Sequence, residues 1–256
     1  IREGLDYASP LVFAGLRTII AGVSLLGLVA ALRQPLIPPR TQWPWILVLA
    51  ATATAASYGA MFVSPDRGGV GIASVLGNLQ PLFVIGLAAP LLGERLTGSD
   101  RAVLVLGVLG AVLIAVPALR GDNAYGLSGP VLAVAASLGF AIGSVVVKRM
   151  NITSGLLTLT GWQLFLGSLP LLLASTVFER DEPVRWTVEF LLLLLFLAII
   201  GTALVTAVWY WLVQREEVGQ LTLFFFLVPV FGVLAGTADA MRESFGSTCH
   251  GAGRRQ

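Results

Sequence analysis

Polar side chains inside long apolar stretches are the first candidates for chemistry in this sequence. They are Arg17, Tyr58, Asn78, Gln80, Trp162 and Gln163. A guanidinium in such a stretch can neutralise an anionic group or pair with another helix, or its long stem can carry the charge out to water. Amides and aromatic rings can hydrogen-bond to and stack on a small molecule, and amides also bond between neighbouring helices. These residue types favour a binding cavity over a catalytic centre.

The residues of a catalytic centre are missing from the apolar stretches. The chain has one Cys and one His, Cys249 and His250, which adjoin in a polar tail. The apolar stretches contain Arg17 but no Asp, Glu, His or Cys. A nucleophile, an acid/base pair or a metal site would need such groups. The sequence therefore predicts no enzyme activity, no metal and no cofactor, with a membrane-embedded enzyme on lipid-linked substrates as the alternative.

The elements that position these residues are transmembrane helices. Hydrophobic residues make up 56% of the 256 residues and charged residues only 12%. A membrane-spanning helix needs about 20 mostly apolar residues. Such stretches lie near 11–32, 45–64, 71–92, 102–119, 129–147, 155–177, 190–213 and 218–236. The predicted fold is an all-α, polytopic membrane helix bundle with eight visible spans.

The charges of the connecting loops predict an orientation. One side carries Arg33, Arg40, Arg95, Arg101, Lys148, Arg149 and Arg215, and the other side carries Arg67, Arg120, Arg180 and Arg185. The side richer in Lys and Arg is expected to face the cytoplasm. Residues 1–10 then lie outside, so we expect one more span upstream.

A weak internal repeat relates two of these spans. A shift of 148 residues, the separation of Pro81 and Pro229, also superposes Gly71, Leu79 and Phe83 on Gly219, Leu227 and Phe231. The two copies lie five spans apart and therefore cross the membrane in opposite directions, which is typical of an inverted-repeat transporter. Each proline deletes a helix hydrogen bond and frees the carbonyl four residues earlier, that of Gly77 in the first copy. Such prolines line a binding cavity or serve only packing.

The stretch from Gly71 to Leu113, GIASVLGNLQPLFVIGLAAPLLGERLTGSDRAVLVLGVLGAVL, resembles the EamA domain of the drug/metabolite transporter superfamily. The resemblance rests on small residues before Pro81, on Glu94 and Arg95 within a Gly-Glu-Arg-Leu-Thr segment that closes the helix, and on the glycine-rich helix that follows. It implies ten helices in two inverted halves of five, and the movement of small metabolites, often by export. Glu94 and Arg95 are then expected to form an ion pair at the membrane interface or to serve as gate residues.

The resemblance also predicts the domain organisation. Residues 1–120 would form the first EamA-like repeat without its first helix, and residues 129–236 the second repeat without its last helix. Residues 237–256, TADAMRESFGSTCHGAGRRQ, replace the expected tenth helix with a polar tail. This tail is either natural or translated out of frame, which leaves a non-transporting fragment as a further alternative.

The resulting functional hypothesis is a secondary transporter that exports amino-acid-like or drug-like solutes by alternating access. Its predicted substrate-binding residues are Arg17, Tyr58, Asn78, Gln80, Pro81, Trp162, Gln163 and Pro229. Its predicted partners are the lipid bilayer and a small-molecule substrate, with no nucleic acid, in the cytoplasmic (inner) membrane of a bacterium. Proton coupling stays open, because the visible spans hold no acidic or imidazole group. The substrate and the oligomeric state stay open as well.

Overall fold

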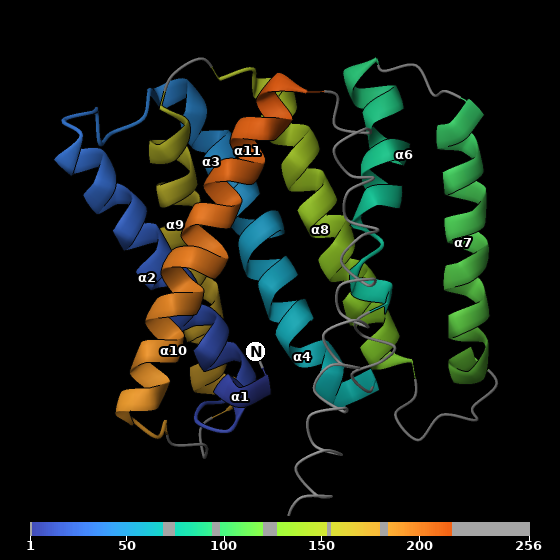
Figure 1. Ribbon diagram of the computed structural model, residues 1–256, viewed down its shortest axis with the longest axis horizontal. Coiled ribbons are helices and arrows are strands. Elements are labelled where there is room, and N and C mark those ends of the chain that lie inside the picture. The colour runs from blue at the N-terminus through green and yellow to red at the C-terminus, as the bar shows by residue number, and fades with distance from the viewer. Residues whose placement is uncertain are drawn as a thin grey trace, which may run out of the picture.

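The computed structural model is an all-helical bundle (Figure 1). It describes residues 2–68, 75–93, 98–119, 127–152, 155–179 and 184–216. Its α-helices are α1 (Arg2–Leu5), α2 (Pro10–Ala31), α3 (Trp43–Leu49), α4 (Ser57–Gly68), α6 (Gln80–Leu92), α7 (Gly98–Leu119), α8 (Ser128–Met150), α9 (Leu156–Phe178), α10 (Val188–Ala198) and α11 (Val205–Arg215). A 3-10 turn, η1 (Arg40–Gln42), precedes α3, and two π-helical segments, η2 (Ala50–Ala56) and η3 (Ile199–Leu204), join α3 to α4 and α10 to α11.

Six segments of the described residues are long and apolar enough to cross a membrane. They are Pro10–Ala31, Arg40–Pro65, Val75–Leu92, Ser128–Met150, Leu156–Phe178 and Val188–Arg215. These segments confirm six of the eight predicted spans. The fourth predicted span, 102–119, lies in α7, whose apolar part Arg101–Leu113 is shorter. The eighth, 218–236, lies outside the described residues, as does the tail 237–256.

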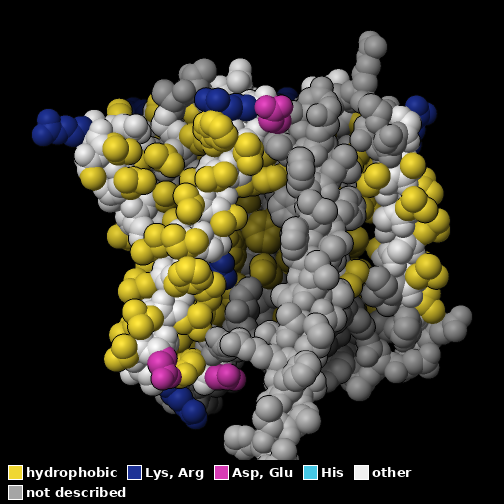
Figure 2. All heavy atoms as spheres, viewed as in Figure 1, with side chains coloured by type: hydrophobic (Ala, Val, Ile, Leu, Met, Phe, Trp, Pro, Cys, Tyr) yellow, Lys and Arg dark blue, Asp and Glu magenta, His cyan; other side chains and the backbone are white. Residues whose placement is uncertain are grey.

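The surface of the bundle has the distribution expected of a membrane protein. Figure 2 shows hydrophobic side chains over the middle of the visible face and charged side chains mainly at its upper and lower edges. Large apolar residues are exposed on α7 and α10, including Leu113 at 71% and Leu192 at 64%. In water such a surface would be unfavourable, whereas lipid chains solvate it.

Close packing depends on glycines where helices cross. On α8, a Cβ at Gly139 would overlap the Thr52 carbonyl oxygen at 2.7 Å, and one at Gly143 would lie 2.6 Å from the Ala53 Cβ. Both contacts bring α8 against η2, because small residues let two helices approach closely. Gly107 is also packed, against the side chain of Leu82.

Local signals fix where several helices begin and end. The Thr187 side chain accepts a hydrogen bond from the Phe190 backbone N–H and caps α10. At the end of α6, Gly93 has a φ of 71°, a left-handed conformation that glycine adopts without strain. The backbone N–H groups at the start of α2 bond instead to the carboxylate of Glu179, which follows α9.

Candidate substrate site

The helix break before Pro81 is the first element of the site. The helical turn at 75–77 ends at Asn78, and α6 begins anew at Gln80 with Pro81 in its first turn. Because proline has no N–H, the Gly77 carbonyl has no partner four residues later. The Ser137 hydroxyl of α8 lies 2.6 Å from this oxygen and 2.8 Å from that of Leu76. Proline therefore opens the helix, and a neighbouring helix completes the hydrogen bonding.

Arg17 is the second element, and its side chain turns into the bundle. Its exposed fraction is 7%. Nε donates to the Thr202 hydroxyl at 2.5 Å, and Nη2 donates to the Gly201 carbonyl at 3.0 Å. The guanidinium also lies 6.0 Å from the centre of the Phe62 ring. Of the three possibilities for Arg17, the structure shows the pairing with another helix, and it does not show a stem that reaches out to water.

The guanidinium is not fully satisfied by these contacts. Arg17 Nη1 is buried and has no hydrogen-bond partner among the described residues. A buried unpaired donor is costly, and more so when it is charged. Arg17 can therefore accommodate one more acceptor, and an anionic one best.

Gln163 is the third element. Its exposed fraction is 1%, and its Nε2 donates to the Thr54 hydroxyl at 3.1 Å and to the Tyr210 hydroxyl at 3.0 Å. Its Oε1 is buried and, within the part of the chain that the structure describes, has no partner. Gln163 can thus accept a hydrogen bond from a ligand.

Tyr58 is a further predicted residue that the bundle buries. Its ring packs edge-on against Phe140 with centroids 5.4 Å apart. Its hydroxyl is close enough to interact electrostatically with both Arg17 and Tyr210. The structure therefore buries three of the predicted residues, Arg17, Tyr58 and Gln163, inside the bundle.

The remaining predicted residues lie elsewhere. Asn78, Gln80 and Pro81 form the helix break, which is held by α8. Trp162 faces away from its neighbour Gln163: its indole N–H donates to the Leu36 carbonyl at 2.8 Å and its ring packs against Trp43. Pro229, Glu94 and Arg95 lie outside the described residues.

Four residues of these clusters were not singled out from the sequence: Thr54, Thr202, Tyr210 and Ser137. A signal for the first two was present. Thr54 and Thr202 are related by the same shift of 148 residues that relates Pro81 to Pro229. The same shift relates Tyr210, a neighbour of Gln163, to Phe62, a neighbour of Arg17.

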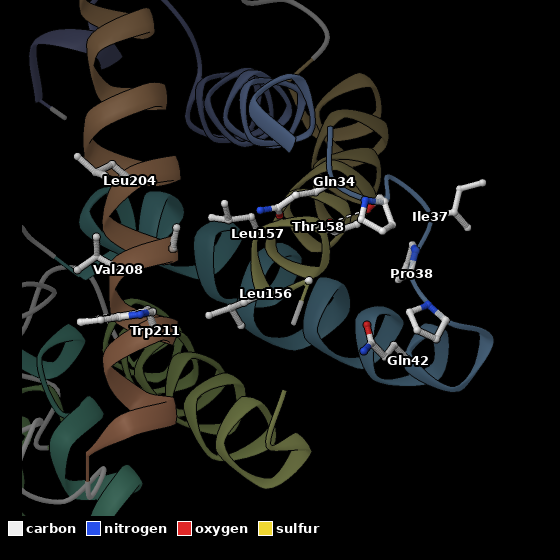
Figure 3. Close-up of a pocket in the computed structure, with 14 residues that line it drawn as sticks. Gln34, Ile37, Pro38, Gln42, Leu156, Leu157, Thr158, Leu204, Val208 and Trp211 are labelled. Atoms are coloured by element: carbon white, nitrogen blue, oxygen red, sulfur yellow. Dashed lines mark hydrogen bonds between the residues drawn. The ribbon is translucent and has the colours of Figure 1, made fainter. Parts of the chain in front are cut away.

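A groove of about 890 Å³ lies apart from the predicted residues, none of which lines it. Figure 3 shows Leu204, Val208 and Trp211 on one wall, and Leu156, Leu157 and Thr158 of α9 facing the loop that follows α2. The three residues on the first wall are each about half exposed. The groove is therefore open at the lipid-facing surface, whereas the Arg17 and Gln163 clusters are enclosed.

Comparison with known proteins assigns the sequence of this chain to a family. The sequence pattern of the EamA-like transporter family matches residues 1–116 and, separately, residues 127–240. This chain belongs to the EamA-like transporter family. Arg17 and Thr54 lie in the first matched segment, and Gln163 and Thr202 in the second.

Several curated relatives of this EamA-like transporter are similar along most of its length. It is 28% identical to the "Uncharacterized transporter YvbV" of Bacillus subtilis (strain 168), over 92% of this chain and 76% of the relative. It is also 28% identical to the "Probable amino-acid metabolite efflux pump" of Salmonella typhimurium, over 95% of this chain and 82% of the relative. Against the "WAT1-related protein At3g02690, chloroplastic" of Arabidopsis thaliana the identity is 29%, and the match spans 61% of that relative.

A solved crystal structure has the same fold. It superposes with a TM-score of 0.75 at 21% sequence identity, covering 94% of this chain and 82% of the other. Family membership makes this chain a multi-pass membrane transporter for small molecules, and it overturns the alternative of a membrane-embedded enzyme.

Proposed function

We propose that this EamA-like transporter exports small amino-acid-like or drug-like solutes that carry an anionic group, by alternating access across a bacterial cytoplasmic membrane. The observation that carries the proposal is the buried Arg17 guanidinium, whose Nη1 has no partner among the described residues. A carboxylate would supply the acceptor that Nη1 lacks among the described residues, and a counter-charge for the guanidinium.

Two further observations support the proposal. Two relatives, from Salmonella typhimurium and Escherichia coli, are named as amino-acid metabolite efflux pumps. The side chains around Arg17 include Phe62 and, within electrostatic reach, Tyr58. Aromatic walls with a few polar groups are typical of sites for small organic solutes. We assign no coupling ion.

Transport by the protein reconstituted in liposomes tests the proposal. The two probes are radiolabelled L-phenylalanine and phenethylamine, which lacks only the carboxylate. We expect the protein to move L-phenylalanine at least tenfold faster, because one charge-assisted hydrogen bond contributes about 1.5–3 kcal/mol. We expect Arg17→Met to abolish this difference and Arg17→Lys to retain part of it.

Equal rates for the two probes in the wild-type protein would refute carboxylate recognition. No movement of either probe, while a broader panel of amino acids and cationic drugs also stays still, would favour the non-transporting fragment. Export is then tested in cells, where expression of the chain should raise tolerance to a toxic phenylalanine analogue.

A further inference from the structure

The internal repeat relates the threonines of the two polar clusters. Thr54 lies in η2 and Thr202 in η3, and these two π-helical segments occupy equivalent positions under the shift of 148 residues. π-helical turns are rare, and they are frequently found at functional sites. Each segment here supplies one threonine hydroxyl to one buried polar side chain.

Each of these hydrogen bonds joins one half of the molecule to the other. Arg17, from the first family match, bonds to Thr202 of the second. Gln163, from the second match, bonds to Thr54 of the first. The packing of the segments likewise joins the two halves: η3 packs against α2, and η2 packs against α9.

The two contacts lie at matching depths from opposite sides. Arg17 is the eighth residue of α2 and Gln163 the eighth residue of α9, so each lies roughly 10 Å along its helix at 1.5 Å per residue. Figure 1 shows that α2 begins at the lower end of the bundle and α9 at the upper end. We call these ends the α2 side and the α9 side. In a hydrocarbon layer of about 30 Å, each contact would then lie about one third of the way in from its own side.

In each cluster one buried polar atom has no hydrogen-bond partner among the residues that the structure describes: Nη1 of Arg17 and Oε1 of Gln163. Each cluster is therefore buried, and each can form one more hydrogen bond. A substrate group can enter and take over the bond that the threonine now makes, an anionic group at Arg17 and a hydrogen-bond donor at Gln163.

We propose that Arg17–Thr202 and Gln163–Thr54 are the two gates of this transporter, each of which holds the halves together on one side and opens while the other stays closed. Thr54 and Thr202 are the positioning residues, since their hydroxyls tie the π-helical segments to the opposite half. The inference rests on the alternating-access cycle proposed above.

Hydrogen–deuterium exchange of the purified full chain in detergent tests the gates without any substrate. We expect Thr202→Val to raise exchange roughly fivefold in peptides from the α2 side, at the starts of α2 and α10, and not on the α9 side. Thr54→Val should raise exchange on the α9 side alone, at the starts of α3 and α9. Valine keeps the shape of threonine and has a methyl group in place of the hydroxyl.

The chain offers matched controls. Thr202→Ser and Thr54→Ser keep the hydroxyl and should exchange like the wild-type protein. Thr52→Val alters the same π-helical segment, but the Thr52 hydroxyl bonds to Val48 of its own helix, so neither side should change. Gly201→Ala offers a second way to weaken the gate on the α2 side, because its Cβ would lie 3.2 Å from Arg17 Nη2.

Unchanged exchange in both valine variants, or faster exchange on the same side in both, would overturn the gate assignment. If Thr202→Val destabilises the whole bundle, Gly201→Ala decides: faster exchange on the α2 side supports the gates, and any other pattern overturns them. Sided exchange in a protein that moves no solute would refute the proposed function and leave the two gates in place.

Discussion

The Ser137 hydroxyl on α8 donates a hydrogen bond to the Gly77 carbonyl, the oxygen that Pro81 leaves without a helical partner. The Leu76 carbonyl lies 2.8 Å from the same hydroxyl. One side chain from a helix 60 residues further along the chain thus stabilises an interruption inside a membrane span. Irregular backbone at this depth persists only where such partners are present.

Ser137→Ala should therefore destabilise the protein by about 1–3 kcal/mol, the cost of leaving a buried acceptor unsatisfied. The measurement is the midpoint of thermal unfolding in detergent, where we expect a loss of several degrees. Ser168→Ala is the control, because that hydroxyl bonds to Phe165 within its own helix. Equal midpoints for the two variants would show that Ser137 does not support the break.

Glu179→Ala should loosen the start of α2. The Glu179 carboxylate accepts hydrogen bonds from the Ser9 hydroxyl at 2.6 Å and from the backbone N–H groups of Leu11 and Val12. It also places a negative charge at a helix N-terminus. We expect a loss of about 1–3 kcal/mol, with the exposed Glu216→Ala as the control that leaves the unfolding midpoint unchanged.

Gly139→Ala should be destabilising although alanine favours helices. The added Cβ would meet the Ser57 side chain and the Thr52 carbonyl oxygen, so α8 must move away from η2. Gly110→Ala is the comparison, because a Cβ there meets nothing within 4 Å among the described residues. In α7 we expect a gain of up to about 1 kcal/mol; a gain at both positions would contradict the packing described for α8.

Tyr7 should ionise at a higher pH than free tyrosine. Its hydroxyl donates to Glu189 at 3.1 Å, and this hydrogen bond together with the negative charge of Glu189 raises the pKa of Tyr7 above its ordinary value of 10.0. A raised pKa means that the bond is present at lower pH and is lost as the pH rises through the folded-state pKa.

Alkaline titration of the near-ultraviolet phenolate absorbance checks this expectation, with Tyr7→Phe subtracted to isolate one tyrosine. Glu189→Gln should bring the Tyr7 transition back toward the ordinary pKa. A transition that stays in place in Glu189→Gln would show that Glu189 is not its cause.

The sequence by itself determined the class of protein. Apolar stretches of about 20 residues admit few structures other than membrane helices, because every backbone polar group in lipid must be bonded within the segment. The same reasoning identified Pro81 as a break, since a missing N–H is a local property. The resemblance of the stretch around Pro81 led to the family that the comparison confirms.

Only the tertiary structure decided what the polar residues do. Trp162 and Gln163 are neighbours in sequence, yet one bonds to the loop after α2 and the other enters the core, because successive residues of a helix point about 100° apart. Arg17 finds its partners in Thr202 and Gly201, 185 and 184 residues away. Hydrophobicity specifies that a helix is buried in lipid, but it does not specify which helix lies beside it; that choice depends on side-chain packing and on pairing of the few buried polar groups.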